Sequence, residues 1–238
     1  MSGRTTPATQ VCCRSAPPGS GPTRRAAPTT GSLSRQAGVA VRHDDAMAHI
    51  ALFHSVLGLR PAELRAAERL CRAGHDVVTP DLFGGETADT LDQGFELVDR
   101  VGWGAVVKRA RQALRGMPDE TVLGGFSMGA GVVADLWPER QAAVGVLLLH
   151  ATADLPASVR PGCRVQLHAA EPDEFTPPER VAALCRAAQE RSVDLEVFRY
   201  PGVGHFYTDR DLPDHDPAAA ELTWRRVLNF LDQGLADH

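Results

Sequence analysis

Residues 124–131 read GGFSMGAG, and they follow the short apolar run Thr121–Leu123. The stretch leads into VVADLW at 132–137, so it predicts a strand, a very tight turn and then a helix. Within it, Gly125, Ser127 and Gly129 form the G-x-S-x-G pattern, which places a serine on a strained strand-to-helix turn. A glycine-rich turn with a capping serine would show the same letters. The pattern therefore needs support from the rest of the chain.

Length and composition favour one globular domain. The chain has 238 residues, of which 43% are hydrophobic and 23% charged, as expected for a soluble protein with a full core. No run approaches the roughly 18 apolar residues that a membrane-spanning helix needs. The formal net charge of −5 gives no support for nucleic-acid binding. We therefore expect neither a membrane nor a nucleic acid as a partner.

The cysteines indicate the compartment. There are five of them, an odd number without C-x-x-C spacing, so neither a disulfide framework nor a zinc site is predicted. A reducing, cytoplasmic location fits this pattern best.

The first 46 residues differ from the remainder. They are rich in Ser, Thr, Pro, Gly, Arg and Ala and show no apolar periodicity, so we predict that they are disordered. An Arg- and Ser-rich leader also resembles an organelle transit peptide. A third reading, which we favour, is a natural start at Met47 with a non-native extension upstream. The predicted domains are thus an extension, 1–46, and a folded unit, 47–238.

From residue 47 onward, strands and helices alternate. We predict six strands, at about 49–54, 76–80, 121–126, 143–150, 164–168 and 193–199. Helices are expected at about 62–72, in a stretch up to 115 that is interrupted near 102–104, after 127, and at 178–190 and 218–233. This alternation is typical of βαβ units. It predicts an α/β fold with three αβα layers around a mainly parallel sheet.

Three candidate catalytic residues lie where strands are predicted to end. Ser127 follows the third strand, Asp173 the fifth and His205 the sixth. Ligands of open α/β sheets bind beyond the carboxyl ends of the strands, so these side chains are expected to meet. A serine hydroxyl needs a base such as histidine to take its proton, and a carboxylate can orient that histidine. The order Ser, Asp, His along the chain is that of an α/β-hydrolase triad.

Two backbone amides complete the expected site. The amide of Met128 and one after the first strand, which we assign to Val56, would form an oxyanion hole. Asp154, in the loop after the fourth strand, is an alternative to Asp173 as the triad acid. Three further histidines lie at strand ends, where packing is their usual role: His54, His150 and His168.

At these residues the chain resembles the dienelactone hydrolase family of α/β hydrolases, from about Ala48 to Leu235. The resemblance rests on five segments: FHSVLGL at 53–59, TPDLFGG at 79–85, GFSMG at 125–129, DEF at 173–175 and GHF at 204–206. It implies an α/β-hydrolase fold and hydrolysis without a metal or an organic cofactor. It also implies the same nucleophile, acid and base, and the same two oxyanion amides.

The chain departs from the family pattern in two places. Dienelactone-cleaving members have a cysteine where this chain has Ser127, and a glutamate where it has Ser55. The arginine that binds the substrate carboxylate in the family matches Arg210 only about one position out of register. From the resemblance we expect possible substrate contacts at Ser55, Leu57, Phe83, Phe206 and Arg210. The small size of the chain and its few insertions predict a modest lid near 86–103.

These observations predict a serine hydrolase that cleaves a small ester, lactone or thioester through an acyl-serine. A carboxylesterase or thioesterase and an acyltransferase of the same fold are alternatives, because serine chemistry does not fix the acyl acceptor. A non-catalytic small-molecule-binding protein of this fold is the alternative from another class. The expected partner is the small substrate, and the expected state is a monomer or a homodimer.

Overall fold

A computed structural model describes residues 10–11 and 47–236, with side chains for 47–233. Six parallel strands form its centre, in the order β3, β2, β4, β5, β6, β7. Their bounds are His49–Phe53 for β2, Asp76–Val78 for β3, Val122–Phe126 for β4, Gly145–Leu149 for β5, Arg164–Glu171 for β6 and Asp194–Pro201 for β7. The predicted α/β-hydrolase fold with a mainly parallel sheet is confirmed.

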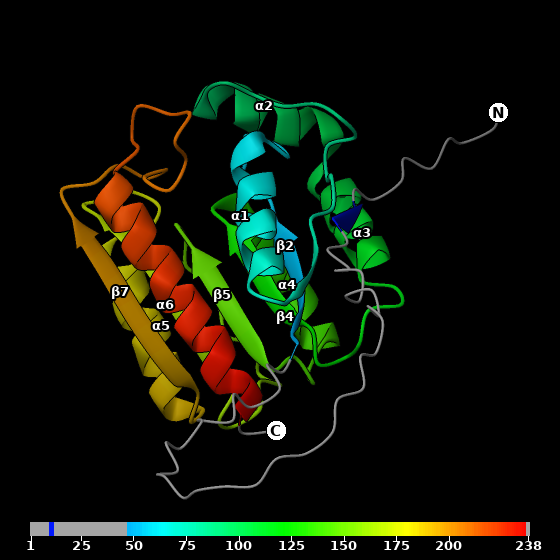
Figure 1. Ribbon diagram of the computed structural model, residues 1–238, viewed down its shortest axis with the longest axis vertical. Coiled ribbons are helices and arrows are strands. Elements are labelled where there is room, and N and C mark those ends of the chain that lie inside the picture. The colour runs from blue at the N-terminus through cyan, green and yellow to red at the C-terminus, as the bar shows by residue number, and fades with distance from the viewer. Residues whose placement is uncertain (1–9, 12–46, 237–238) are drawn as a thin grey trace, which may run out of the picture.

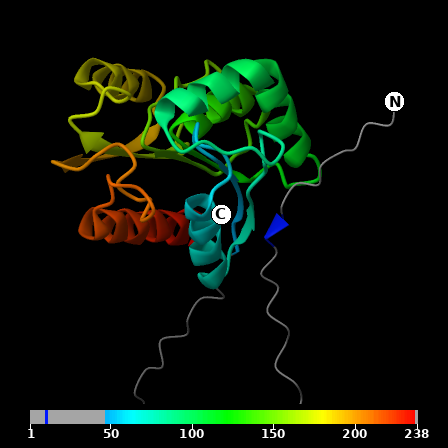
Figure 2. The same ribbon diagram turned by 90° about the horizontal axis from the view of Figure 1, so that it is seen from above.

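Helices cover both faces of this sheet. In Figure 2, α1 (Pro61–Arg72) and α6 (Pro217–Ala236) lie on one face. On the other face lie α3 (Trp103–Ala113), α4 (Met128–Leu136) and α5 (Pro178–Glu190). The helix α2 (Leu91–Val101) lies across the end of the sheet at the top of Figure 1. In the part of the chain that the structure describes, no helix is long and apolar enough to cross a membrane.

The strand β1 (Gln10–Val11) comes from the predicted extension. It pairs antiparallel with β3 and forms the edge of the sheet. The rest of the extension, 1–9 and 12–46, lies outside the described residues, so its predicted disorder stays a prediction. No sequence pattern indicated this strand, because two residues are too few to show a periodicity.

The central strands are buried on both faces, which explains their continuous apolar sequence. Every residue of β4 and β5 is buried. Side chains alternate between the two faces of a strand. Val146 and Leu148 accordingly join the hydrophobic cluster that includes α4, whereas Leu147 and Leu149 join the cluster that includes α1 and α6. This packing fixes β4 and β5, whose carboxyl ends carry the candidate site.

The turn from β4 into α4 brings three backbone segments into very close contact. A Cβ on Gly125 would overlap the backbone carbonyl group of Gly129. A Cβ on Gly129 would overlap the carbonyl oxygen of Phe53 and lie 2.9 Å from that of His54. Since backbone atoms cannot move aside, glycine is required at both positions. The same contacts place the N-terminus of α4 against the end of β2.

We expect Gly129→Ala to lower the free energy of unfolding by about 3 kcal/mol, because the methyl group has no space between α4 and β2. The matched control is Gly131→Ala in the same helix, where the added Cβ meets only the Trp103 side chain, at 3.4 Å. There we expect no loss and a gain of up to about 1 kcal/mol, since alanine favours a helix over glycine. Urea denaturation measures both. Equal losses in the two variants would contradict the proposed steric constraint.

Candidate active site

Ser127 occupies the turn between β4 and α4 in a strained conformation. Its φ of 48° and ψ of −110° lie where residues other than glycine are rare. The Ser127 amide donates to the Leu149 carbonyl oxygen at 2.7 Å, and the Ala130 amide donates to the Ser127 carbonyl oxygen at 2.9 Å. These bonds hold the backbone at the end of β5 and the start of α4. The strain is therefore maintained by the packed elements on either side.

Ser127, His205 and Asp173 are brought into one hydrogen-bonded chain. The distance from Ser127 Oγ to His205 Nε2 is 2.9 Å, and His205 Nδ1 lies 2.8 Å from Asp173 Oδ2. A carboxylate can only accept hydrogen bonds, so Nδ1 carries a proton and donates a hydrogen bond to Asp173. In the neutral ring, Nε2 is then the acceptor that faces the serine hydroxyl. This arrangement suits removal of the serine proton by the imidazole.

Asp173 is held as a carboxylate by its hydrogen bonds. Burial by itself would raise its pKa, but bonds from His205 and from the Phe175 amide, at 2.9 Å, outweigh burial and hold the pKa below its usual value. The alternative acid, Asp154, lines a different cavity, together with Arg180 and Arg191. Of the two carboxylates, only Asp173 contacts His205 among the described residues.

The two amides predicted to form the oxyanion hole follow neighbouring strands: Val56 lies in the loop after β2, and Met128 follows the turn after β4. The Met128 side chain packs against the cluster that contains Val56 and Leu57. Met128 is the first residue of α4, where the amides lack helical partners and the helix dipole favours negative charge. Within the described part of the chain, neither the Val56 nor the Met128 amide donates to a protein acceptor. Both are thus available to an oxygen beside Ser127.

Each of the other three histidines predicted at strand ends has a supporting contact of its own, although His168 lies inside β6 because this strand continues to Glu171. His54 joins two loops: its Nδ1 lies 2.7 Å from the Ser55 carbonyl oxygen, and its Nε2 accepts from the Leu82 amide at 3.0 Å. Burial lowers its pKa to about 4. His168 contacts Tyr200 and Gln166, and burial lowers its pKa to about 3. Both rings are therefore neutral.

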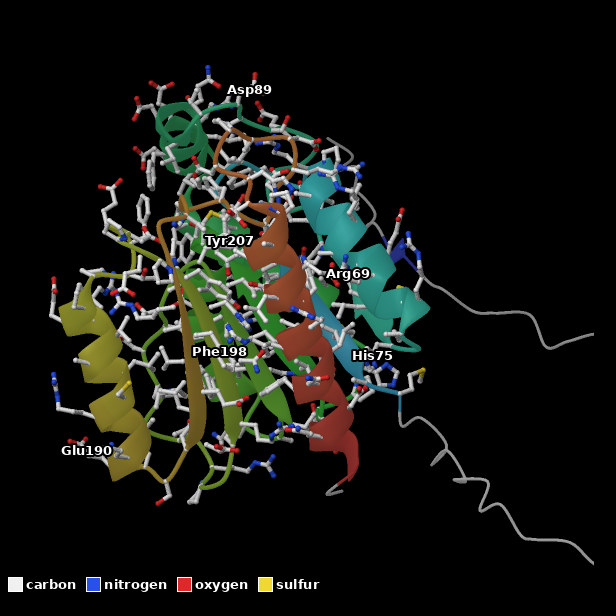
Figure 3. All side chains as sticks on the ribbon, turned by 60° about the vertical axis from the view of Figure 1, so that its left-hand side comes forward. Arg69, His75, Asp89, Glu190, Phe198 and Tyr207 are labelled. Atoms are coloured by element: carbon white, nitrogen blue, oxygen red, sulfur yellow. The ribbon has the colours of Figure 1, made fainter. Side chains whose placement is uncertain are left out.

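His150 lies beside His205. It has a positive φ of 69°, and its ring centroid is 5.8 Å from that of His205 and 4.9 Å from that of Tyr207. Its Nε2 lies 2.9 Å from Thr208 Oγ1. Burial, and next the charge of His205, lower its pKa to about 3. A neutral His150 thus supports the loop that carries His205 (Figure 3 marks Tyr207 on this loop, at the end of the sheet below α2).

The residues expected to contact substrate occupy different environments. Leu57 and Phe83 are buried in the hydrophobic clusters, and the ring of Phe206 lies 4.5 Å from that of His205. Ser55 and Arg210 both line a cavity of about 270 Å³ between α1 and α6. Arg210 is mostly exposed and lies 3.9 Å from Asp211. Neither Ser127 nor His205 lines this cavity, so a contact between Arg210 and a substrate at Ser127 stays a prediction.

Two features of the site were missed in the sequence. The ring of Phe175 lies 4.6 Å from that of His205, and Phe95 of α2 lies 6.4 Å from Phe175 with 47% of its surface exposed. An apolar residue among the charges of α2 was the available signal for Phe95. The second feature is Glu63, whose buried carboxyl contacts Ser55. Among the described residues, no group of three or more His, Cys, Asp or Glu side chains is arranged to bind a metal ion.

Buried neutral histidines predict that acidification weakens the fold. An unfolded histidine titrates near pH 6.5, whereas the pKa of folded His168 is about 3. Between these values only the unfolded state takes up the proton, so stability falls as the pH falls. Between pH 6.5 and 5 the loss is about 2 kcal/mol for this group. In urea denaturation, the free energy of unfolding should fall by about 2 kcal/mol more in the wild type than in His168→Gln when the pH is lowered from 6.5 to 5. Parallel pH curves for the two proteins would contradict the prediction.

Comparisons with known proteins identify the family and the fold. The model of the dienelactone hydrolase family matches residues 37–235. Similar solved structures include a dienelactone hydrolase-like promiscuous phosphotriesterase from metagenomic libraries, with 19% identity over 78% of this chain and 86% of the other and a TM-score of 0.63. A candidate dienelactone hydrolase from Klebsiella pneumoniae has 16% identity over 81% of this chain and 90% of the other, with a TM-score of 0.62. A cold-adapted esterase from an Arctic intertidal metagenomic library has 18% identity over 81% of this chain and 85% of the other, with a TM-score of 0.55.

No curated protein sequence matches the chain. The structural likenesses, all below 25% identity, show the shared fold, and the family model covers most of the chain. The chain belongs to the dienelactone hydrolase family and is a hydrolase with the α/β-hydrolase fold.

Proposed function

We propose that this hydrolase cleaves a small ester, lactone or thioester through an acyl-serine intermediate on Ser127. The observation that carries the proposal is the continuous chain of contacts from Ser127 Oγ to His205 Nε2, at 2.9 Å, and from His205 Nδ1 to Asp173 Oδ2, at 2.8 Å. Such a chain provides a nucleophile, a base and a group that orients the base.

The reaction begins with attack of Ser127 Oγ on the substrate carbonyl carbon while His205 Nε2 takes the hydroxyl proton. The carbonyl oxygen becomes an oxyanion, which the Val56 and Met128 amides and the N-terminus of α4 stabilise. When the tetrahedral intermediate collapses, the bond to the leaving group breaks and His205 gives its proton to that group. Water, activated by His205, then attacks the acyl-serine. The acid is released and Ser127 regains its proton.

The surroundings of His205 favour an uncharged acyl or leaving group. The rings of Phe175 and Phe206 lie within 4.6 Å of the imidazole, centroid to centroid, and the exposed ring of Phe95 extends this row toward solvent. Aromatic rings bind apolar groups by burying their surface. Among the described residues, Asp173 is the only charged side chain that forms a hydrogen bond or an ion pair with His205, and its negative charge repels a carboxylate.

Replacing the nucleophile should abolish turnover. We expect Ser127→Ala to lower kcat for p-nitrophenyl acetate by at least about 1,000-fold, since removal of one triad member leaves only residual catalysis. A fluorophosphonate probe should label Ser127 in the wild type, as read by peptide mass spectrometry. Ser158→Ala, which changes an exposed serine, is the control with unchanged kcat and labelling. Equal turnover by wild type and Ser127→Ala, without label on Ser127, would exclude the acyl-serine mechanism.

The identity of the acid can be tested with two isosteric substitutions. Asp173→Asn leaves His205 Nδ1 without a carboxylate partner, so we expect kcat to fall by about 1,000- to 10,000-fold. Asp154→Asn should stay within about twofold of wild type, because Asp154 lies against α5 in a different cavity. Steady-state kinetics with p-nitrophenyl esters measures both. The reverse ranking of the two variants would assign the role to Asp154.

A further inference from the structure

Glu63 in the first turn of α1 is a buried carboxyl group, with 4% of its surface exposed. Its Oε2 accepts a hydrogen bond from the Arg60 amide at 3.1 Å, the capping role that glutamate often has at the third position of a helix. Capping needs only one of the two oxygens and does not require burial. Here burial raises the pKa of Glu63 to about 7, although hydrogen bonds from backbone amides partly offset this rise. The fold therefore bears a desolvation cost that capping does not explain.

The other carboxyl oxygen contacts the loop between β2 and α1. Glu63 Oε1 lies 3.4 Å from the Ser55 amide nitrogen and 3.2 Å from Ser55 Oγ. Ser55 Oγ also accepts from the Leu57 amide at 3.3 Å. The carboxyl thus holds Ser55 directly and Leu57 through Ser55. These are the two neighbours of Val56.

The peptide group that carries the Val56 amide is fixed through its carbonyl oxygen. This oxygen belongs to Ser55; it lies 2.7 Å from His54 Nδ1 and accepts from the Gly58 amide at 3.1 Å. A trans peptide is planar, so its N–H points opposite to its C=O. The contacts of Ser55 therefore set the direction of the Val56 N–H. Of the amides at 55–58, only that of Val56 lacks an acceptor among the described residues.

We propose that Glu63 is a positioning residue for residues 55–58, which we call the oxyanion loop. Its carboxyl holds Ser55 so that the Val56 amide stays directed at the oxygen that becomes negative during attack by Ser127. This inference rests on the proposed function, since it requires an oxyanion beside Ser127. A donor that is already oriented stabilises the transition state without reorganisation. Loss of Glu63 should consequently affect kcat more than KM.

The test compares four substitutions with p-nitrophenyl acetate as the substrate. Glu63→Ala removes the carboxyl, and we expect kcat to fall about 10- to 100-fold while KM changes less than about threefold. Glu63→Gln keeps a carbonyl oxygen for the Ser55 donors, so kcat should stay within about fivefold of wild type. The matched control is Glu68→Gln, which changes an exposed glutamate on the same helix and should leave both constants unchanged. Ser55→Ala should lower kcat by about fivefold or more.

A double-mutant cycle separates positioning from a general loss of structure. If Glu63 acts through Ser55, the variant carrying both alanines should be no slower than Glu63→Ala alone. Multiplicative losses in kcat would overturn the proposal, as would a folded Glu63→Ala with the wild-type kcat. Should Glu63→Ala fail to fold, a folded Ser55→Ala with unchanged kcat would overturn it instead.

Two readouts keep this proposal distinct from the proposed function. Hydrogen exchange at 55–58 should be faster in Glu63→Ala than in Glu68→Gln, because the loop loses its support. Labelling of wild-type Ser127 by a fluorophosphonate reports on the nucleophile itself. A labelled wild type with an unchanged kcat in Glu63→Ala would reject only the role of Glu63. An unlabelled wild type would reject the acyl-serine mechanism, and the role of Glu63 with it.

Discussion

The candidate site depends on how closely α4 approaches the end of β2. Gly125 and Gly129 allow backbone contacts that no side chain would permit. This approach places Ser127 at the first turn of α4, with its amide bonded to β5. It also brings the amide of Met128 and the loop that contains Val56 to the same edge of the sheet. The proposed nucleophile and the proposed oxyanion donors are therefore positioned by one steric constraint.

The sequence allowed the fold and the triad geometry to be anticipated because both follow from local patterns. Apolar runs separated by helical stretches predict a parallel sheet, and the carboxyl ends of its strands meet at one edge. Ser127, Asp173 and His205 follow three such ends, and the structure places them within 2.9 Å of one another in series. The sequence left Asp154 open as an alternative acid, because Asp154 also follows a strand end; the contact with His205 favours Asp173. Boundaries were less well predicted: β6 continues to Glu171 because its pairing with β7 continues, not because its sequence is more apolar.

The supporting contacts could not be predicted because they join residues by packing across elements. Glu63 has the sequence signature of an ordinary capping residue, and only the packing of α1 against β2 turns its second oxygen toward Ser55. His54 and His150 occupy strand ends as a catalytic histidine would. Their roles differ from that of His205 because burial keeps their rings neutral and the Nε2 atom of each contacts a structural partner, the Leu82 amide or Thr208 Oγ1. His54 and His150 share the residue type and the strand-end position of His205. Their lower solvent access distinguishes them from it.

The first turns of α1 connect the two loops on which catalysis would depend. Through Glu63, this region holds Ser55 beside the Val56 amide. Through Arg60 and Arg65, at 3.6 and 3.4 Å, it pairs with the nearly buried Asp209, four residues after His205. Ion pairs with little solvent access are screened less than exposed ones, so these contacts tie the histidine loop to α1. The proposed oxyanion donor and the proposed general base thus share one support, on the face of the sheet opposite the helix that follows Ser127.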